Sequence, residues 1–439
     1  MTTRWIHGAT FKVLGIGLLA LLMLIPLAQV NDLVREREGR AYEATMQIAS
    51  RWGAQQKLGG PVLVVPVQTT QRQGDAQVTT ETREYLLPDR LAIRTHLEPE
   101  VRRYGLYETV VYVAETTLEG RFLATDIAAL AGPGRDVQWQ RAELRVPVAD
   151  VRGIRRVSPL RFGEHELSFG TDAGGVAGIA AISAPVRLEA GALPPQLSFA
   201  FDLALAGSER FSVLPLARQT ELQASGAWAD PGFDGAFLPA SRRVDAKGFE
   251  ASWQVLDLNR RIAQRWSEAD SNGLALCESA FGVSLVRPAG PYQQNVRAGK
   301  YGVLFVALTF VAFFLFEVLR GLRVHPVQYL LVGVALCTFY VVLLALSEQF
   351  GFGPAYFAAA AATVALVGGY AAAVLAQRRA GFVLAGLMAL VYGLLYGLVA
   401  SEDYALLMGA LALLATVSAL MYLTRRVDWY AMGPAGHAS

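Results

Sequence analysis

Charged side chains stand at the ends of long apolar runs in the last third of the chain, and these are the residues placed to do chemistry. Glu317 closes one run, three residues before Arg320, and Glu348, Glu402 and Asp403 follow others. Charge next to a membrane is energetically costly, so each group is a candidate for pairing, ion binding or substrate binding. Glu317 and Arg320 have helical i, i+3 spacing, which predicts an ion pair at the cytoplasmic boundary.

The outer acids allow two interpretations. Glu348, Glu402 and Asp403 are either solvated helix ends or one cluster that holds a cation, a polar substrate or a basic segment. Arg297 and Lys300 stand just before the first of the C-terminal apolar runs, at the same predicted interface. Because carboxylates alone would repel one another in low-dielectric surroundings, we hypothesise that these two cations meet the acids and lock the preceding domain to the helices.

Signatures of catalysis and of metal binding are absent from the sequence. It has no P-loop, no His-Glu-x-x-His, no Gly-x-Ser-x-Gly and no Ser-x-x-Lys motif, and its five histidines are scattered. Glu164-His165-Glu166 would turn its carboxylates to one side of a strand and its imidazole to the other, which favours a solvated edge. We therefore predict a protein that is not an enzyme, with no catalytic residues, metal or cofactor.

The elements that must position these residues are membrane spans. A span needs about 20 apolar residues, and the chain offers one run near the N-terminus and five at the end. They cover residues 13–30, 301–319, 327–346, 356–376, 382–400 and 404–423. The first run also fits a signal peptide, but its length and poor cleavage site favour an uncleaved anchor.

Basic residues set the orientation. Arg4 and Lys12 precede the first run, and arginine pairs follow three of the later ones at 320/323, 378/379 and 425/426. Positively charged loops stay in the cytoplasm, so we predict that both termini are cytoplasmic and that residues 31–300 are periplasmic. The expected organisation is residues 1–30 with the first span, 31–300 as the outer domain, 301–424 as a five-helix bundle and 425–439 as a tail.

Residues 31–300 are predicted to be rich in β-structure. Short apolar or alternating runs at 62–67, 109–117, 196–205, 211–216 and 249–258 are separated by Gly and Pro clusters. Glycines at 170–178 mark a candidate subdomain boundary. The segment holds 31 basic and 32 acidic residues, so nucleic-acid binding has no electrostatic support. Cys277 is its only cysteine, so it must fold without an internal disulfide.

Several strings of residues resemble the CreD family of bacterial inner-membrane proteins over nearly the whole chain. They include Trp253-Gln254-Val255, Asn259-Arg260, Phe281-Gly282-Val283, Arg297-Ala298-Gly299-Lys300-Tyr301, His325-Pro326-Val327-Gln328-Tyr329, Ser347-Glu348, Glu402-Asp403-Tyr404 and Arg425-Arg426-Val427-Asp428-Trp429-Tyr430. The resemblance implies an inner-membrane location and a role in cell-envelope integrity or stress response. It brings no established catalytic residues.

Two classes of function follow. The first is a non-enzymatic envelope-integrity protein whose periplasmic domain binds an envelope component or a protein partner. The second is a transporter or lipid-handling protein that uses the five-helix bundle as a path, although no helix centre carries the charge pair that coupled carriers use. Membrane lipids are expected partners in both, nucleic acid in neither, and homo-oligomerisation stays open.

Overall fold

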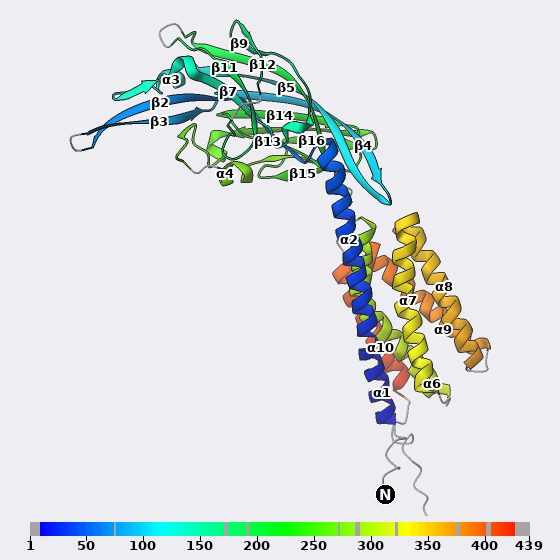
Figure 1. The fold of residues 1–439 in the computed structure, drawn as a ribbon. Coiled ribbons are helices and arrows are strands. Elements are labelled where there is room, and N and C mark those ends of the chain that lie inside the picture. Colours follow the sequence, from blue (N-terminus) through cyan, green and yellow to red (C-terminus); the bar gives the residue numbers. More distant parts are fainter. Residues whose placement is uncertain are drawn as a thin grey trace, which may run out of the picture. The chain divides into compact units, whose positions relative to one another are not determined.

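The chain forms two compact units in a computed structural model (Figure 1). The structure describes residues 9–73, 76–170, 174–189, 193–270, 273–285, 290–320, 324–374, 378–400 and 405–425. The helical unit comprises Met1–Ala41 and Ala289–Ser439, and the β unit comprises Tyr42–Pro288. The division falls inside a helix, because α2 runs from Leu24 to Trp52.

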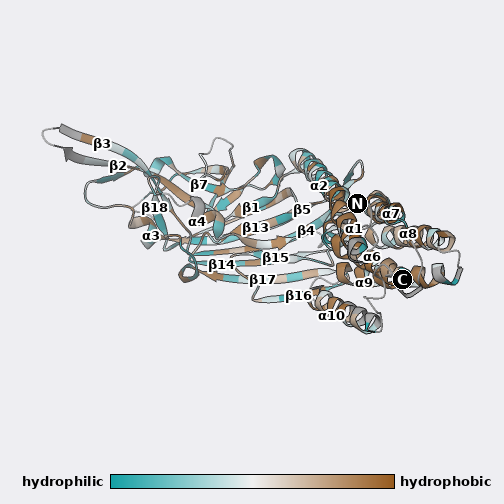
Figure 2. Cartoon of the chain, turned by 90° about the horizontal axis from the view of Figure 1, so that it is seen from below, coloured by the Kyte–Doolittle hydropathy of each residue, from teal (hydrophilic) through white to brown (hydrophobic). Residues whose placement is uncertain are grey.

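The described part of the helical unit is made of helices, most of them long and apolar. They are α1 (Ala9–Leu22), α2 (Leu24–Trp52), α5 (Pro291–Lys300), α6 (Gly302–Arg320), α7 (Pro326–Phe350), α8 (Phe352–Val374), α9 (Arg378–Ala400) and α10 (Ala405–Thr424). Apolar residues dominate α6 to α9, whereas polar and apolar residues alternate in many strands of the β unit (Figure 2).

Four helices of the described part are long and apolar enough to cross a membrane. They cover Leu14–Trp52, Pro326–Phe350, Phe352–Val374 and Gly381–Ala400. A fifth is added if α5 and α6, which meet at a bend of 45°, count as one span. These helices coincide with the predicted runs at the N-terminus and in the last third, and α10 covers the last predicted run.

The start of α7 shows how local sequence fixes a helix end. His325 is the N-cap: its Nδ1 accepts a hydrogen bond from Val327 N at 3.3 Å, and the Gln328 side chain accepts one from His325 N at 3.0 Å. This reciprocal arrangement is a capping box. Pro326 occupies the first turn, where its missing N–H removes no helical hydrogen bond.

Small residues bring α8 and α9 together. A Cβ added at Gly381 would lie 2.4 Å from the Cβ of Ala372, and one added at Gly368 would lie 2.8 Å from that of Ala385. Aromatic rings fill another part of the interior of the helical unit. Phe339 packs edge-on against Tyr392 and Tyr356, with ring centroids 4.7 and 5.5 Å apart.

Three sheets form the β unit, which confirms the predicted β-rich domain. The nine-stranded sheet has the order β10-β9-β12-β5-β4-β14-β17-β16, with β8 paired to β12. The six-stranded sheet has the order β11-β7-β2-β3-β18, with β6 paired to β2, and the four-stranded sheet has the order β1-β13-β19-β15. Two short helices, α3 (Ala124–Ala128) and α4 (Gly273–Glu278), complete the unit.

The strands of the nine-stranded sheet are β4 (Arg90–Tyr104), β5 (Tyr107–Leu123), β8 (Ile154–Val157), β9 (Leu160–Phe162), β10 (His165–Leu167), β12 (Gln196–Ser208), β14 (Gln219–Gly226), β16 (Ser241–Asp245) and β17 (Gly248–Leu256). The others are β1 (Gln56–Gly59), β2 (Val62–Gln73), β3 (Ala76–Leu86), β6 (Arg135–Val137), β7 (Ala142–Pro147), β11 (Ala181–Val186), β13 (Arg210–Leu214), β15 (Gly232–Gly235), β18 (Arg265–Ser267) and β19 (Phe281–Ser284).

Strand β2 explains the continuous apolar run that starts the domain. Leu63 and Val65 belong to the main core between the sheets, whereas Val62 and Val64 belong to a second core that includes Trp266. A strand buried on both faces loses the alternation of a half-exposed strand. Cys277 and Cys337 are both free, so neither core depends on a disulfide between them.

The end of α2 is fixed to the sheets by polar contacts within the β unit. Trp52 Nε1 donates a hydrogen bond to Tyr112 O at 3.2 Å, and Arg102 lies 4.2 Å from the centre of its ring. Asp150 accepts hydrogen bonds from Ala54 N at 3.0 Å and from Arg152 Nε at 2.8 Å. The Arg152 hydrogen bond lowers the pKa of Asp150 below its ordinary value.

Candidate functional site

The predicted outer acid Glu348 lies at the end of α7 and has partners from two other helices. Its side chain is only 10% exposed. It accepts a hydrogen bond from Tyr292 Oη of α5 at 3.1 Å, and Arg37 Nε of α2 lies 4.0 Å away. Beside it, Asn295 of α5 is buried and donates to Ser347 Oγ at 2.8 Å. These contacts join α2, α5 and α7 through polar groups.

Only two of the other four members of the predicted outer cluster belong to the described residues. Arg297 is half-buried and Lys300 exposed, both near the end of α5. Glu402 and Asp403 lie outside the described residues. Among the described residues, Arg37 forms an ion pair with Glu348, and the sequence did not predict this partner. A lock through Arg297 or Lys300 stays a prediction.

The predicted boundary acid Glu317 is buried, with 4% of its side chain exposed. It accepts hydrogen bonds from Val324 N at 2.8 Å and Tyr329 Oη at 2.9 Å, and it is paired with Lys12 of α1. The side chain of Arg320, its predicted partner, lies outside the described part of the structure. Lys12 was missed because its charge was used only for orientation. The predicted topology already places Lys12 and Glu317 at the same membrane boundary.

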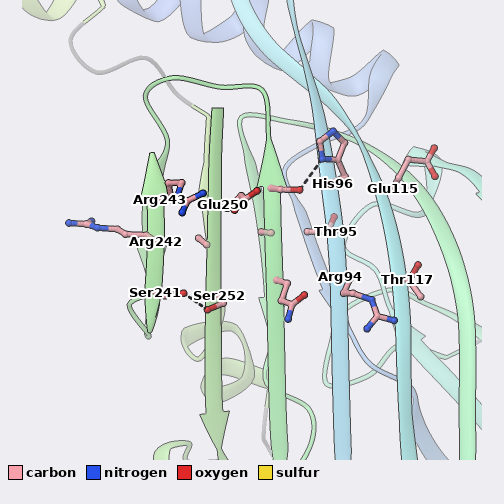
Figure 3. A pocket seen from close by; sticks show the side chains of 14 residues that line it. Arg94, Thr95, His96, Glu115, Thr117, Ser241, Arg242, Arg243, Glu250 and Ser252 are labelled. Atoms are coloured by element: carbon pink, nitrogen blue, oxygen red, sulfur yellow. Dashed lines mark hydrogen bonds between the residues drawn. The ribbon is translucent and has the colours of Figure 1, made fainter. Parts of the chain in front are cut away.

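A polar surface of the β unit, which we call the open face, was also missed. Along β4, β14 and β17, alternate residues are buried in the core and the others face outward. The strand register aligns the outward residues in two rows. One row is Arg243, Glu250, Ser225, His96 and Glu115; the next is Ser241, Ser252, Gln223, Arg94 and Thr117. Figure 3 shows these side chains on neighbouring strands.

Hydrogen bonds join side chains within each row, and one ion pair joins a row to Glu119. His96 Nδ1 lies 2.9 Å from Ser225 Oγ, and the hydroxyls of Ser241 and Ser252 lie 2.7 Å apart (Figure 3). Arg94 pairs with Glu119 on the adjacent strand at 2.9 Å. The groove over the rows has a volume of about 730 Å³. Exposed cross-strand ion pairs contribute little to stability, so these groups are available to bind a ligand.

Ser225 and His96 are the residue types of a nucleophile and its general base. The acid that would have to orient the imidazole, Glu115, is instead paired with another residue. Glu115, the cross-strand neighbour of His96, accepts a hydrogen bond from Arg156 at 2.8 Å. A catalytic imidazole needs a partner that fixes its orientation. The chemistry that the open face supports is hydrogen bonding and charge pairing with a polar ligand.

Metal binding has no site in the parts of the chain that the structure describes, where no group of three His, Cys, Asp or Glu side chains converges. Glu164-His165-Glu166 lies at the start of the edge strand β10, and all three residues are exposed. Glu166 is aligned with Arg161 of β9. This is the solvated edge that the alternation of a strand predicts for these residues.

Long apolar helices joined to a large β-rich unit define an integral membrane protein with a substantial part outside the bilayer. Comparison with known proteins agrees. The chain matches the family described as Inner membrane protein CreD over residues 8–430. It is 32% identical over 415 residues to Inner membrane protein CreD of Escherichia coli (strain K12), with 94% of this chain and 91% of the relative covered. The chain belongs to the CreD family of inner membrane proteins.

Proposed function

We propose that this inner-membrane protein maintains cell-envelope integrity by binding an envelope component or protein partner through the open face of its β unit. In this proposal residues 31–300 lie in the periplasm, five spans follow, and both termini are cytoplasmic. Membrane lipids surround the apolar helices, and the chain performs no catalysis. The observation that carries the proposal is the open face itself, whose two rows present hydroxyl, amide, imidazole and charged groups over a broad groove.

The orientation rests on the distribution of basic residues. Arginine pairs follow the first, third and fifth C-terminal runs, and the intervening loops at 347–354 and 401–403 contain no Lys or Arg. The positive-inside rule then places the arginine pairs in the cytoplasm. With the arginine pairs in the cytoplasm, residues 31–300, which follow the N-terminal run, lie on the periplasmic side. There the polar groove could meet envelope components.

The packing of the helical unit favours binding over transport. The rings of Phe305, Phe339, Tyr356 and Tyr392 interlock, and each of these side chains is at most 2% exposed. A path through the bundle would have to separate them. The polar contacts of Glu348 and Glu317 join helices to one another, which suits a rigid anchor for the β unit.

Complementation tests the proposal. Gln223 is exposed at the centre of the open face, so Gln223→Trp would fill the groove without disturbing the core. Thr80→Trp places the same side chain on an exposed position of β3, away from the open face. In cells that lack the protein, we expect Thr80→Trp to restore resistance to detergent and exclusion of a membrane-impermeant dye. Gln223→Trp should fail at equal protein level, and full restoration would contradict the proposal.

A further inference from the structure

Strand β16 forms one edge of the nine-stranded sheet. It pairs antiparallel with β17, from Ser241 opposite Ser252 to Asp245 opposite Gly248. In the described part of the chain no other strand pairs with it, and all five of its residues are exposed. Half of the backbone hydrogen-bonding groups of an edge strand point away from the sheet, where they can pair with an added strand.

Basic residues outnumber acidic ones along this edge, where the acids are Asp245 and Glu250, the latter aligned with Arg243. Arg242, Arg243 and Lys247 are exposed, and none of them forms an ion pair with another described residue. Asp245 is occupied by the turn, because its Oδ1 accepts hydrogen bonds from Lys247 N at 2.7 Å and Gly248 N at 3.1 Å. Arg242 extends away from the sheet in Figure 3. The edge therefore offers three cations to an approaching chain.

We propose that β16 is a docking edge for an extended acidic peptide, which adds a strand to the sheet and places carboxylates against these cations. This inference rests on the proposed function, because it names the class of partner that binds beside the open face. Backbone pairing supplies affinity in such complexes, and side chains at alternate positions supply specificity.

A peptide fits this edge better than a glycan does. Only a peptide strand can complete the outward backbone groups of β16 in register. The two rows of the open face carry no tyrosine, tryptophan or phenylalanine on which a sugar ring could stack. Charged residues on an edge strand also prevent aggregation, and the experiment below separates that role from ligand binding.

Pairing with β16 restricts the sequence of the ligand peptide. Arg243 is the middle residue of β16, so the ligand residue opposite it is the central one whether the new strand runs parallel or antiparallel. Five paired residues span roughly 17 Å at about 3.4 Å per residue. An acidic residue at the centre of a five-residue β-prone segment is the expected signature.

Fluorescence anisotropy tests the inference with the full-length protein in nanodiscs of uncharged lipid. The probe is a fluorescein-labelled nine-residue peptide of alternating Thr and Glu. One control replaces Glu by Lys, and a second keeps the charges but replaces two central Thr residues by Pro, which cannot donate to the ladder. We expect the Thr–Glu peptide to bind at least tenfold more tightly than either control.

Two charge reversals locate the site. Arg243→Glu should weaken binding of the Thr–Glu peptide about fivefold or more, whereas Arg161→Glu, the same change on an exposed position of β9, should leave it unchanged. If both variants lose the same amount of peptide affinity, binding depends only on the net charge of the protein, and the inference is overturned. Equal binding of the Pro peptide would overturn strand pairing. If the Thr–Glu peptide does not bind and the Arg243→Thr variant self-associates, the inference is wrong. The basic residues of β16 then serve only to prevent aggregation at this sheet edge.

The complementation experiment separates this inference from the proposed function. If the Thr–Glu peptide does not bind but Gln223→Trp still fails in cells, the docking edge is wrong and the open face keeps its role. If the peptide binds as expected but Gln223→Trp restores cells fully, the docking edge stands and the proposed function falls.

Discussion

Breaking the Lys12–Glu317 pair should destabilise the helical unit. Lys12→Met keeps the aliphatic length of the side chain but leaves Glu317, 4% exposed, with two neutral donors and no cation among the described side chains. Removing one partner of a buried ion pair costs about 3–5 kcal/mol. Because the Lys12 side chain is 35% exposed, we expect the low end, about 3 kcal/mol in the free energy of unfolding.

Glu317→Gln in the same chain should recover much of this loss. The Gln carbonyl oxygen can still accept a hydrogen bond from Val324 N or Tyr329 Oη, and no buried charge remains. The double variant should therefore be only about 1 kcal/mol less stable than the wild type. Glu317→Gln alone removes the partner of Lys12 and should not stabilise the protein, so the coupling energy should be at least about 2 kcal/mol, well above that of independent sites.

Reversible unfolding in mixed detergent micelles, followed by tryptophan fluorescence, measures these differences. Lys12→Arg is the matched control, because it retains a cation at the same helix position and should cost less than about 1 kcal/mol. Additive effects of the two single changes would refute a direct pair.

Met23 and Leu27 are also buried in the helical core, so the N-terminal helix should still be present in the purified mature protein.

Three further predictions concern the membrane topology and the β unit. Reporter fusions after Arg379 and after Ser401 should report opposite sides of the membrane, and reports from the same side would refute the topology. The lowered pKa of Asp150 makes its contribution to stability full above about pH 4, the ordinary value for an aspartate. That contribution is lost as the pH falls through the lower folded-state value, so the stability difference between wild type and Asp150→Asn should be constant from pH 8 to 5 and shrink in stronger acid. Arg260, buried, donates to Ala217 O, Ile262 O and Gln264 Oε1 at 3.2, 2.6 and 2.9 Å; Arg260→Met should cost about 3 kcal/mol in denaturant unfolding. Burial lowers the pKa of Arg260 to about 10, so its guanidinium stays charged and this cost should not vary between pH 5 and 8.

Many of the long helices and strands could be predicted from the sequence, because their hydrophobic patterns involve residues close together in the chain. The apolar runs predicted the long helices through length and composition, and the run at 62–67 predicted β2 through its apolar β-branched residues and the turn residues that bound it. The partner of a helix face is harder to predict. The close approach of α9 to α8 at Gly381 depends on Ala372 of the neighbouring helix, and composition alone does not reveal that pairing.

The sites depend on contacts between distant parts of the chain. Lys12 and Glu317 are 305 residues apart, and no spacing rule connects them. The open face needs the register of β4, β14, β17 and β16 together, and β4 pairs with β14 across more than 120 residues of chain. Alternation along one strand indicates which residues face outward. Only the pairing order shows that His96 lies beside Ser225.

Photo-crosslinking in living cells can show whether the open face contacts an envelope component. A photoreactive phenylalanine analogue replaces Gln223 on the open face or, as a control at another exposed position, Thr80 on β3. After irradiation of living cells, we expect a discrete adduct of higher mass from position 223 and none from position 80. No adduct from 223, or the same adducts from both positions, would contradict the proposed contact.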